Sequence, residues 1–190
     1  MNTPLGEHNR AIIFDMQKKK FLSKEFPSLR YASFCGETLC GIEIKGQFSE
    51  LVLIDQESFE KKEGVSKSGL GKTGLLKAGP GLPYSAIYNP VFAGKNKIAL
   101  IAANGINRDI LILDTASKKI QKLEFENPLP AIRYLQSNNS EEEPVLSFSW
   151  AGKGNLYRSA FFNLKTNELN VLEKDISGGT FFPIVSRKKD

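Results

Sequence analysis

The sequence predicts an all-β protein built from repeated antiparallel sheets, and three observations lead to this fold class. First, few apolar residues recur at the i, i+3, i+4, i+7 spacing of an amphipathic helix. Second, short runs rich in β-branched and aromatic residues are separated by clusters of Gly, Asn, Asp and Ser, which is the pattern of strands joined by turns. Third, three groups of these strands align with one another, so the chain contains an internal repeat.

The repeat has a fixed internal order. Each copy reads as a strand, a Gly-containing turn, a strand that ends in Asp or Asn, a short polar turn and a final strand. The copies span residues 41–63, 99–126 and 146–175. One further strand leads into each copy, in the stretches "RYASFCGE", "IYNPVFAGKN" and "AIRYLQSN". Four short strands per repeat are typical of the blades of a β-propeller.

The residue that closes the middle strand marks the period of the repeat. It is Asp55, Asp114 and Asn163 in the three copies, and Asp15 holds the same place in a partial copy near the start of the chain. The intervals between these markers are 40, 59 and 49 residues. A short Asp or Asn side chain can bond the backbone two residues further on and so start a turn. We therefore assign these four residues to structural turns.

These repeats predict a single β-propeller-like domain over residues 1–190, with about four blades of four-stranded antiparallel sheets. The start of the chain supplies the last two strands of a blade, and "GTFFPIVSRKKD" reads as one more leading strand. If residues 12–14 paired near residues 181–185, the two ends would complete one blade and remove an open edge. The alternative is an open fragment of a larger propeller, and the sequence leaves both arrangements open.

One repeat is similar to a known class. The stretch "NPVFAGKNKIALIAANGINRDILILDTASKKIQKL" resembles a blade of the TolB-type and related WD-like β-propeller repeats. Those repeats contain a proline, an aromatic residue, a polar turn, an apolar strand and a strand that ends in Asp. Here Pro90, Phe92, the "AGKNK" turn and the strands that end at Ala102 and Asp114 hold these places. The resemblance implies a β-propeller fold and extends loosely over most of the chain.

Residues 66–74, "SKSGLGKTG", end like a phosphate-binding P-loop. A P-loop needs a glycine at the position that Ser66 holds here, a strand before it and a helix after it. The preceding "KKEGV" is charged, and the glycines and prolines of the following "GLLKAGPGLPY" prevent a helix of any length. The sequence therefore predicts a loop, with no bound nucleotide and no other cofactor.

The same stretch belongs to a Gly- and Lys-rich inserted loop, residues 63–84, which lengthens the second interval of the repeat. Loops on a rigid scaffold often carry binding function. Lys67, Lys72 and Lys77 give this insertion positive charge, so we assign them as candidate contacts for an acidic partner. Such an attraction would weaken as salt rises.

The sequence favours a non-enzymatic binding or scaffold propeller that recognises a protein segment or a small ligand. The leading strands carry few of the His, Asp and Glu side chains that a catalytic centre would need, and we assign no catalytic residue. The alternative is a propeller enzyme of the hydrolase or lyase type, with acids lining the central channel. Fold alone does not decide between the two functions.

The amino-acid composition narrows the classes of partner and ligand that are expected. The formal net charge is +5, but the aromatic-basic motif of an RNA-binding sheet is missing, so a nucleic acid is not the expected partner. One His and two Cys cannot supply the usual four ligands of a structural zinc ion, and we assign no metal site.

No apolar run reaches the length of a membrane span. The first residues lack the pattern of a signal peptide. The protein is therefore expected in the cytoplasm if Met1 is the native start, and in the periplasm or outside the cell if a signal peptide was removed.

The two cysteines, Cys35 and Cys40, flank the four residues "GETL". If this segment is a hairpin turn, the two side chains face each other across the ladder and are close enough to form a disulfide bond. The alternative is a pair of small, half-buried thiols, and this second interpretation is favoured.

Overall fold

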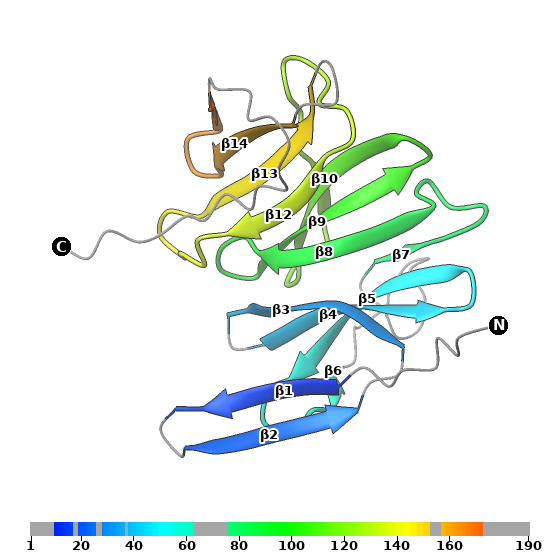
Figure 1. The fold of residues 1–190 in the computed structure, drawn as a ribbon, viewed down its shortest axis with the longest axis vertical. Helices are drawn as coiled ribbons and strands as arrows, with labels where there is room; N and C mark the ends of the chain where they lie inside the picture. The colour runs from blue at the N-terminus through cyan, green and yellow to red at the C-terminus, as the bar shows by residue number, and fades with distance from the viewer. Residues whose placement is uncertain are drawn as a thin grey trace.

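Every regular element of the described structure is a β-strand. The computed structural model describes residues 10–16, 19–25, 28–36, 38–62, 76–152 and 157–172. No helix occurs in these ranges, so the prediction of an all-β protein is confirmed. Figure 1 shows the strands as a series of separate sheets.

The strands form four antiparallel sheets. The first is a hairpin of β1 (Arg10–Asp15) and β2 (Lys20–Glu25). The second has the order β3-β4-β5-β6 with β7 beside β5, and its strands are β3 (Leu29–Cys35), β4 (Thr38–Lys45), β5 (Phe48–Asp55), β6 (Lys61–Lys62) and β7 (Lys77–Ala78). The third contains β8 (Ala86–Phe92), β9 (Lys97–Asn104), β10 (Asn107–Asp114) and β11 (Ile120–Lys122). The fourth contains β12 (Arg133–Ser137), β13 (Val145–Ala151), β14 (Tyr157–Asn163) and β15 (Glu168–Val171).

The last three sheets follow the predicted blade pattern, with a leading strand and three more strands in chain order. Their leading strands are neighbours, because β8 contacts both β3 and β12. Figure 1 shows β12, β8 and β3 one above another. The sheets form an open series in the described part of the chain, and the expected pairing with residues 181–185 falls outside the described ranges.

The third sheet is packed on both faces. Side chains of β9 alternate between two apolar clusters, as the period of two in a strand requires. Ile98 and Leu100 pack in one cluster with residues of β4 and β5. Ala99 and Ile101 pack in the other cluster with residues of β13 and β14. The run of apolar residues in β9 therefore reflects burial on both sides of the sheet rather than one solvated face.

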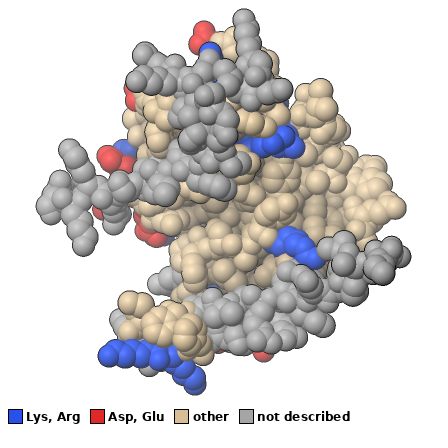
Figure 2. All heavy atoms as spheres, in the orientation of Figure 1, with Lys and Arg blue, Asp and Glu red and all other residues tan. Residues whose placement is uncertain are grey.

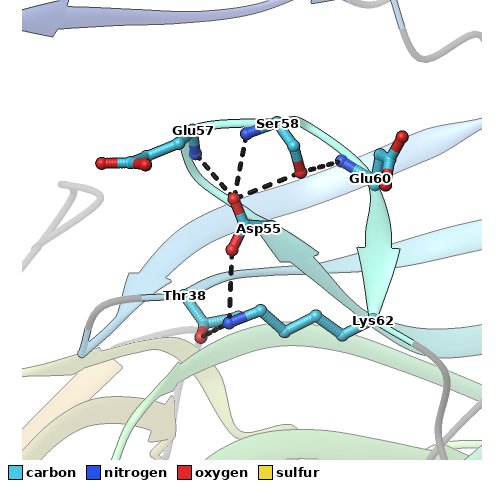
Figure 3. A network of polar contacts seen from close by, with 6 residues as sticks. All are labelled: Thr38, Asp55, Glu57, Ser58, Glu60 and Lys62. Atoms are coloured by element: carbon cyan, nitrogen blue, oxygen red, sulfur yellow. Dashed lines mark hydrogen bonds and ion pairs between the residues drawn. The ribbon is translucent and has the colours of Figure 1, made fainter.

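The turns after β5, β10 and β14 share one construction. The last residue of each strand, Asp55, Asp114 or Asn163, accepts hydrogen bonds through Oδ1 from the backbone N–H groups two and three residues further on, over 2.7–3.2 Å. In the first turn, Asp55 Oδ2 also lies 3.6 Å from Lys62 Nζ (Figure 3). The backbone donors hold the pKa of both aspartates below the usual range. The side chain of Asp15 is outside the described side chains.

The interpretation of Cys35 and Cys40 as free thiols is wrong, because their sulfur atoms are bonded to each other. The two residues are also not directly opposite, since Cys35 pairs with Thr38 and Cys40 pairs with Ser33. Their Cα atoms lie 5.9 Å apart along a diagonal of the β3–β4 ladder, which is within the reach of a disulfide. The register of this hairpin therefore brings together two side chains that simple facing across the turn would not.

Part of the Gly- and Lys-rich insertion belongs to the second sheet, because β7 pairs with β5. Leu76 and Ala78 are buried in the apolar cluster of that sheet. The carbonyl of Leu76 accepts a hydrogen bond from the Leu51 N–H over 2.8 Å. Residues 63–75, which include the P-loop-like stretch, are outside the described ranges.

Candidate functional site

The candidate site is the surface formed by β3, β8 and β12, which we call the first-strand face. Each of these strands has an irregular register with the second strand of its sheet. Each irregularity contains a residue with a left-handed backbone, at Tyr31 (φ 51°), Asn89 (φ 51°) and Tyr134 (φ 56°). This conformation is unfavourable for a tyrosine. Such irregularities re-aim side chains and are frequent near functional sites, so their presence in all three strands directs attention to this face.

The first-strand face is rich in tyrosine. The chain contains five tyrosines, and three of them, Tyr31, Tyr88 and Tyr134, are on β3, β8 and β12. Tyr84 precedes β8, and Tyr157 begins β14. The three first strands contain no Asp or Glu. In Figure 2 the visible surface over β8 and β3 is mostly uncharged, with Lys and Arg atoms in separate places and Asp and Glu atoms near the margins.

Three arginines lie against these tyrosines or on the same strands. The Arg108 guanidinium carbon is 5.6 Å from the centre of the Tyr88 ring, and the Arg133 guanidinium carbon is 5.2 Å from that of Tyr157. Arg30 is on β3, next to Tyr31. A guanidinium over an aromatic ring is attracted by the negative face of the ring. The face therefore combines positive charge with aromatic surface.

Neighbouring sheets are connected at this face. The rings of Tyr31 and Tyr88, from the second and third sheets, lie 5.9 Å apart. Arg108, from β10 of the third sheet, donates a hydrogen bond through Nη1 to the carbonyl oxygen of Ile132 over 3.1 Å. Ile132 immediately precedes β12, so the third and fourth sheets are joined at the edge of the same face.

Two polar atoms of the first-strand face are buried without a hydrogen-bond partner among the described residues. They are Tyr88 Oη and Arg133 Nε. Burial raises the pKa of Tyr88, and the positive charges of Arg108 and Arg133 act in the opposite direction. Most buried polar side-chain atoms in proteins are hydrogen-bonded, so an exception calls for a physical reason.

A cavity of about 720 Å³ lies beside the first-strand face, and Arg108 is part of its wall. Its apolar lining includes Phe125 and several prolines. Its lining contains two acids, Asp109 and Glu124. Asp109 accepts a hydrogen bond from Tyr84 Oη over 3.1 Å, and its Oδ1 lies 3.4 Å from Lys122 Nζ. Burial, followed by the charge of Asp109, raises the pKa of Tyr84. Asp109 is thus held by two partners.

The two buried acids of the second sheet are also paired. Lys45 Nζ lies 2.9 Å from Glu43 Oε2 and 3.1 Å from Glu50 Oε2, and Lys61 pairs with Glu43 Oε1. Burial by itself would raise the pKa of Glu43, but the hydrogen bonds and charges of the two lysines outweigh it and hold that pKa below the usual value. An ion-paired carboxylate with a lowered pKa is a poor general acid at neutral pH.

Of the three lysines assigned from the sequence, only Lys77 lies within the described ranges. Lys67 and Lys72 are outside the described ranges. Lys77 is on β7, and its Nζ lies 4.1 Å from the centre of the Phe48 ring. Sequence reasoning missed the first-strand face, although an "RY" pair stands at the same place in two leading strands, "RYASF" and "IRYLQ".

Two classes of feature do not occur in the described ranges. None of their elements is a helix with the length and apolar character needed to cross a membrane. They also contain no group of three or more His, Cys, Asp or Glu side chains placed to hold a metal ion.

The open series of four-stranded antiparallel sheets defines a β-propeller-type fold, and comparison with solved structures agrees. TolB from Acinetobacter baumannii superposes with a TM-score of 0.58 at 13% sequence identity, over 85% of this chain and 37% of that chain. The tricorn protease gives a TM-score of 0.41 at 11% identity, over 90% of this chain and 19% of its own. The superposition on TolB confirms the resemblance to TolB-type repeats for the fold.

Comparison of sequences gives one curated relative with no assigned function. It is an uncharacterized protein from Treponema pallidum (strain Nichols), 30% identical over 181 residues. The match covers 93% of this chain but only 16% of the length of the relative. No family model matches the sequence.

Proposed function

We propose that this chain is a non-enzymatic binding or scaffold module that recognises a segment of another protein on the first-strand face. The observation that carries the proposal is the gathering of tyrosines and arginines there. Tyr and Arg are enriched among the residues that contribute most to protein–protein binding, because they bury a large area and also offer polar groups. Tyr31 is 53% exposed, so a partner could cover much of its ring.

The charge of the face favours an acidic segment. Arg30, Arg108 and Arg133 supply positive charge, and the first strands themselves carry no acid. Matching of opposite potentials speeds association and selects partners. A segment with Asp or Glu side chains is therefore the partner that this face suits best.

The enzymatic alternative has less support. The first strands carry no Asp or Glu to line a channel, and Asp109, Glu43 and Glu50 are engaged by neighbouring side chains. A catalytic acid or base must instead reach a proton of the substrate.

The loop lysines offer a second place for an acidic partner. Lys67 and Lys72 carry the same charge as the first-strand face, and an acidic segment could contact both regions. Lys77 differs, because its ammonium lies over the Phe48 ring. Loop contacts of this kind would depend strongly on salt.

The test begins with selection of binding peptides from a phage-displayed library on the purified chain, followed by fluorescence anisotropy with the selected peptide. We expect Tyr31→Ala to weaken binding about thirtyfold, since truncation of a residue at the centre of an interface costs about 2 kcal/mol. A Lys67→Ala/Lys72→Ala variant tests the loop, and we expect its effect to shrink as salt rises. Ile106→Ala, at a residue 87% exposed on the β9–β10 turn, is the matched control.

The outcomes separate the alternatives. If only the loop variant weakens binding, the site is the insertion and the first-strand face is not used. If the library yields no peptide that binds the folded chain, or if no selected peptide is sensitive to either variant, the proposed function is wrong.

A further inference from the structure

The first-strand face contains two hydrogen-bonding atoms that no described residue of the fold bonds. Tyr88 Oη is on β8 and Arg133 Nε is on β12, and both are buried without a partner among the described residues. The two strands contact each other, so the atoms come from adjacent elements of one face. A buried polar group without a hydrogen bond is unfavourable, and each such group calls for a physical explanation, such as a water or an ion that completes it.

The same place carries positive charge that no acid among the described residues balances. Arg108 lies over the Tyr88 ring, and Arg133 lies over the Tyr157 ring. Neither arginine forms an ion pair with a carboxylate in the described part of the chain. One N–H of Arg108 is used by the Ile132 carbonyl, which fixes the position of its guanidinium. The remaining charge is held at the face by this bond and by the ring contacts.

These groups define the chemistry of a ligand. An O–H donor, an Nε–H donor and two guanidinium charges suit an oxygen anion, which can accept several hydrogen bonds at once. The planar guanidinium of arginine matches the two oxygens of a carboxylate in particular. A cation, or a ligand that only donates hydrogen bonds, would leave the Arg133 Nε–H without a partner.

We propose that Tyr88 and Arg133, assisted by the charge of Arg108, form a subsite that binds a carboxylate of the protein segment on the first-strand face. This inference rests on the proposed function for the identity of the ligand, but the chemistry of the subsite can be tested alone. The carboxylate comes either from an Asp or Glu side chain or from the C-terminus of the segment.

The first experiment uses small anions as probes. Sodium acetate is titrated into the ¹⁵N-labelled chain at constant ionic strength with chloride, and the NMR signals of the Arg133 side-chain Nε–H and the Tyr88 backbone amide are followed. We expect a saturable shift in the wild type. Tyr88→Phe and Arg133→Lys should each weaken acetate binding about tenfold, as loss of a hydrogen bond to a charged group does.

Two controls keep the result specific. Tyr84→Phe removes a hydroxyl that is already bonded to Asp109, so it should leave acetate binding unchanged. Tyr88→Phe removes only an unpartnered hydroxyl, so it should fold normally, with a melting temperature no lower than that of the wild type. The inference is overturned if acetate gives no saturable shift below 100 mM (about 1.4 kcal/mol of binding). It is also overturned if the two variants respond like the wild type, or if inorganic phosphate binds much more tightly than acetate.

The second experiment connects the subsite to the proposed function. Selected peptides are compared with versions in which each Glu is changed to Gln and each Asp to Asn, and with free and amidated C-termini. Loss of affinity in one series identifies the source of the carboxylate, provided that Arg133→Lys removes the difference. If acetate binds but no peptide does, the subsite stands and the proposed function fails. If peptides bind equally well in every form, the protein segment binds without this subsite and the inference fails.

Discussion

The third sheet and the β1–β2 hairpin contain similar strands in very different surroundings. In β9, six consecutive residues are buried, because neighbouring sheets cover both faces. In the hairpin, Phe14 is 43% exposed and Phe21 is 68% exposed, and their rings contact each other 4.8 Å apart. A two-stranded hairpin alone is marginally stable in water. A repeat of this kind therefore draws its stability from the sheets on either side rather than from its own strands.

The largest effect should come from breaking the packing of the third sheet. Ile101→Ala removes a fully buried side chain between two sheets and should lower the free energy of unfolding by about 2–5 kcal/mol. Phe21→Ala, in the hairpin, should change it by less than about 0.5 kcal/mol, as exposed substitutions usually do. Urea denaturation of both variants measures the difference. Equal losses would show that the hairpin is packed as firmly as the third sheet.

A smaller effect should come from opening the one hairpin that is closed covalently. The Cys35–Cys40 disulfide joins β3 to β4, whereas β1 and β2 are held by hydrogen bonds and side-chain contacts. Replacement of both cysteines by alanine should cost about 2 kcal/mol, because a short loop is released in the unfolded chain. Thermal unfolding with and without a reducing agent provides the measurement. A wild type that does not respond to reduction, while still losing its disulfide, would contradict this expectation.

The smallest effect concerns the turns, where the third sheet uses Asp114 and the fourth uses Asn163 in the same geometry. The pKa of Asp114 is lowered in the folded protein, so its ionised form stabilises the fold above the unfolded pKa of about 3.9. That contribution is lost as the pH falls through the folded pKa. Asp114→Asn keeps the acceptor oxygen but loses the charge, and should lower the melting temperature at pH 7 slightly.

The same substitution should reduce the loss of stability between pH 5 and pH 2, and adding Asp55→Asn should reduce it further. Melting temperatures of the wild type and the two variants, measured over this pH range, test this prediction. An unchanged acid profile in the double variant would mean that other groups control the acid response of the fold.

The fold could be predicted from the sequence because local sequence patterns mark each repeat. The apolar strands, and the Asp or Asn residue that ends the middle strand of each copy, both follow from short-range chemistry. The β7 strand was missed, since it lies in a Gly- and Lys-rich stretch and is formed by pairing with β5 rather than by its own pattern. The disulfide was misjudged because the register of a hairpin depends on its turn, which the residues "GETL" leave undefined.

The candidate site was less accessible to sequence reasoning. The "RY" pairs at Arg30 and Arg133 are visible in the sequence, but they become a site only when β3, β8 and β12 lie next to one another. The left-handed residues Tyr31 and Tyr134 carry no sequence signal, since tyrosine rarely adopts that conformation. Contacts between distant strands and unusual backbone angles are consequences of the whole fold, and no local pattern reports them.

The hydrogen bond from Arg108 to Ile132 couples the proposed binding surface to the packing of two sheets. The guanidinium of Arg108 lies over the Tyr88 ring of its own sheet. It also donates a hydrogen bond to the carbonyl oxygen of Ile132, the residue just before the next sheet. The Arg108 side chain is thus part of the proposed binding surface and also links two sheets. A ligand that displaces this guanidinium should also change the spacing between the third and fourth sheets. Conversely, a change in that spacing should alter the shape of the binding surface.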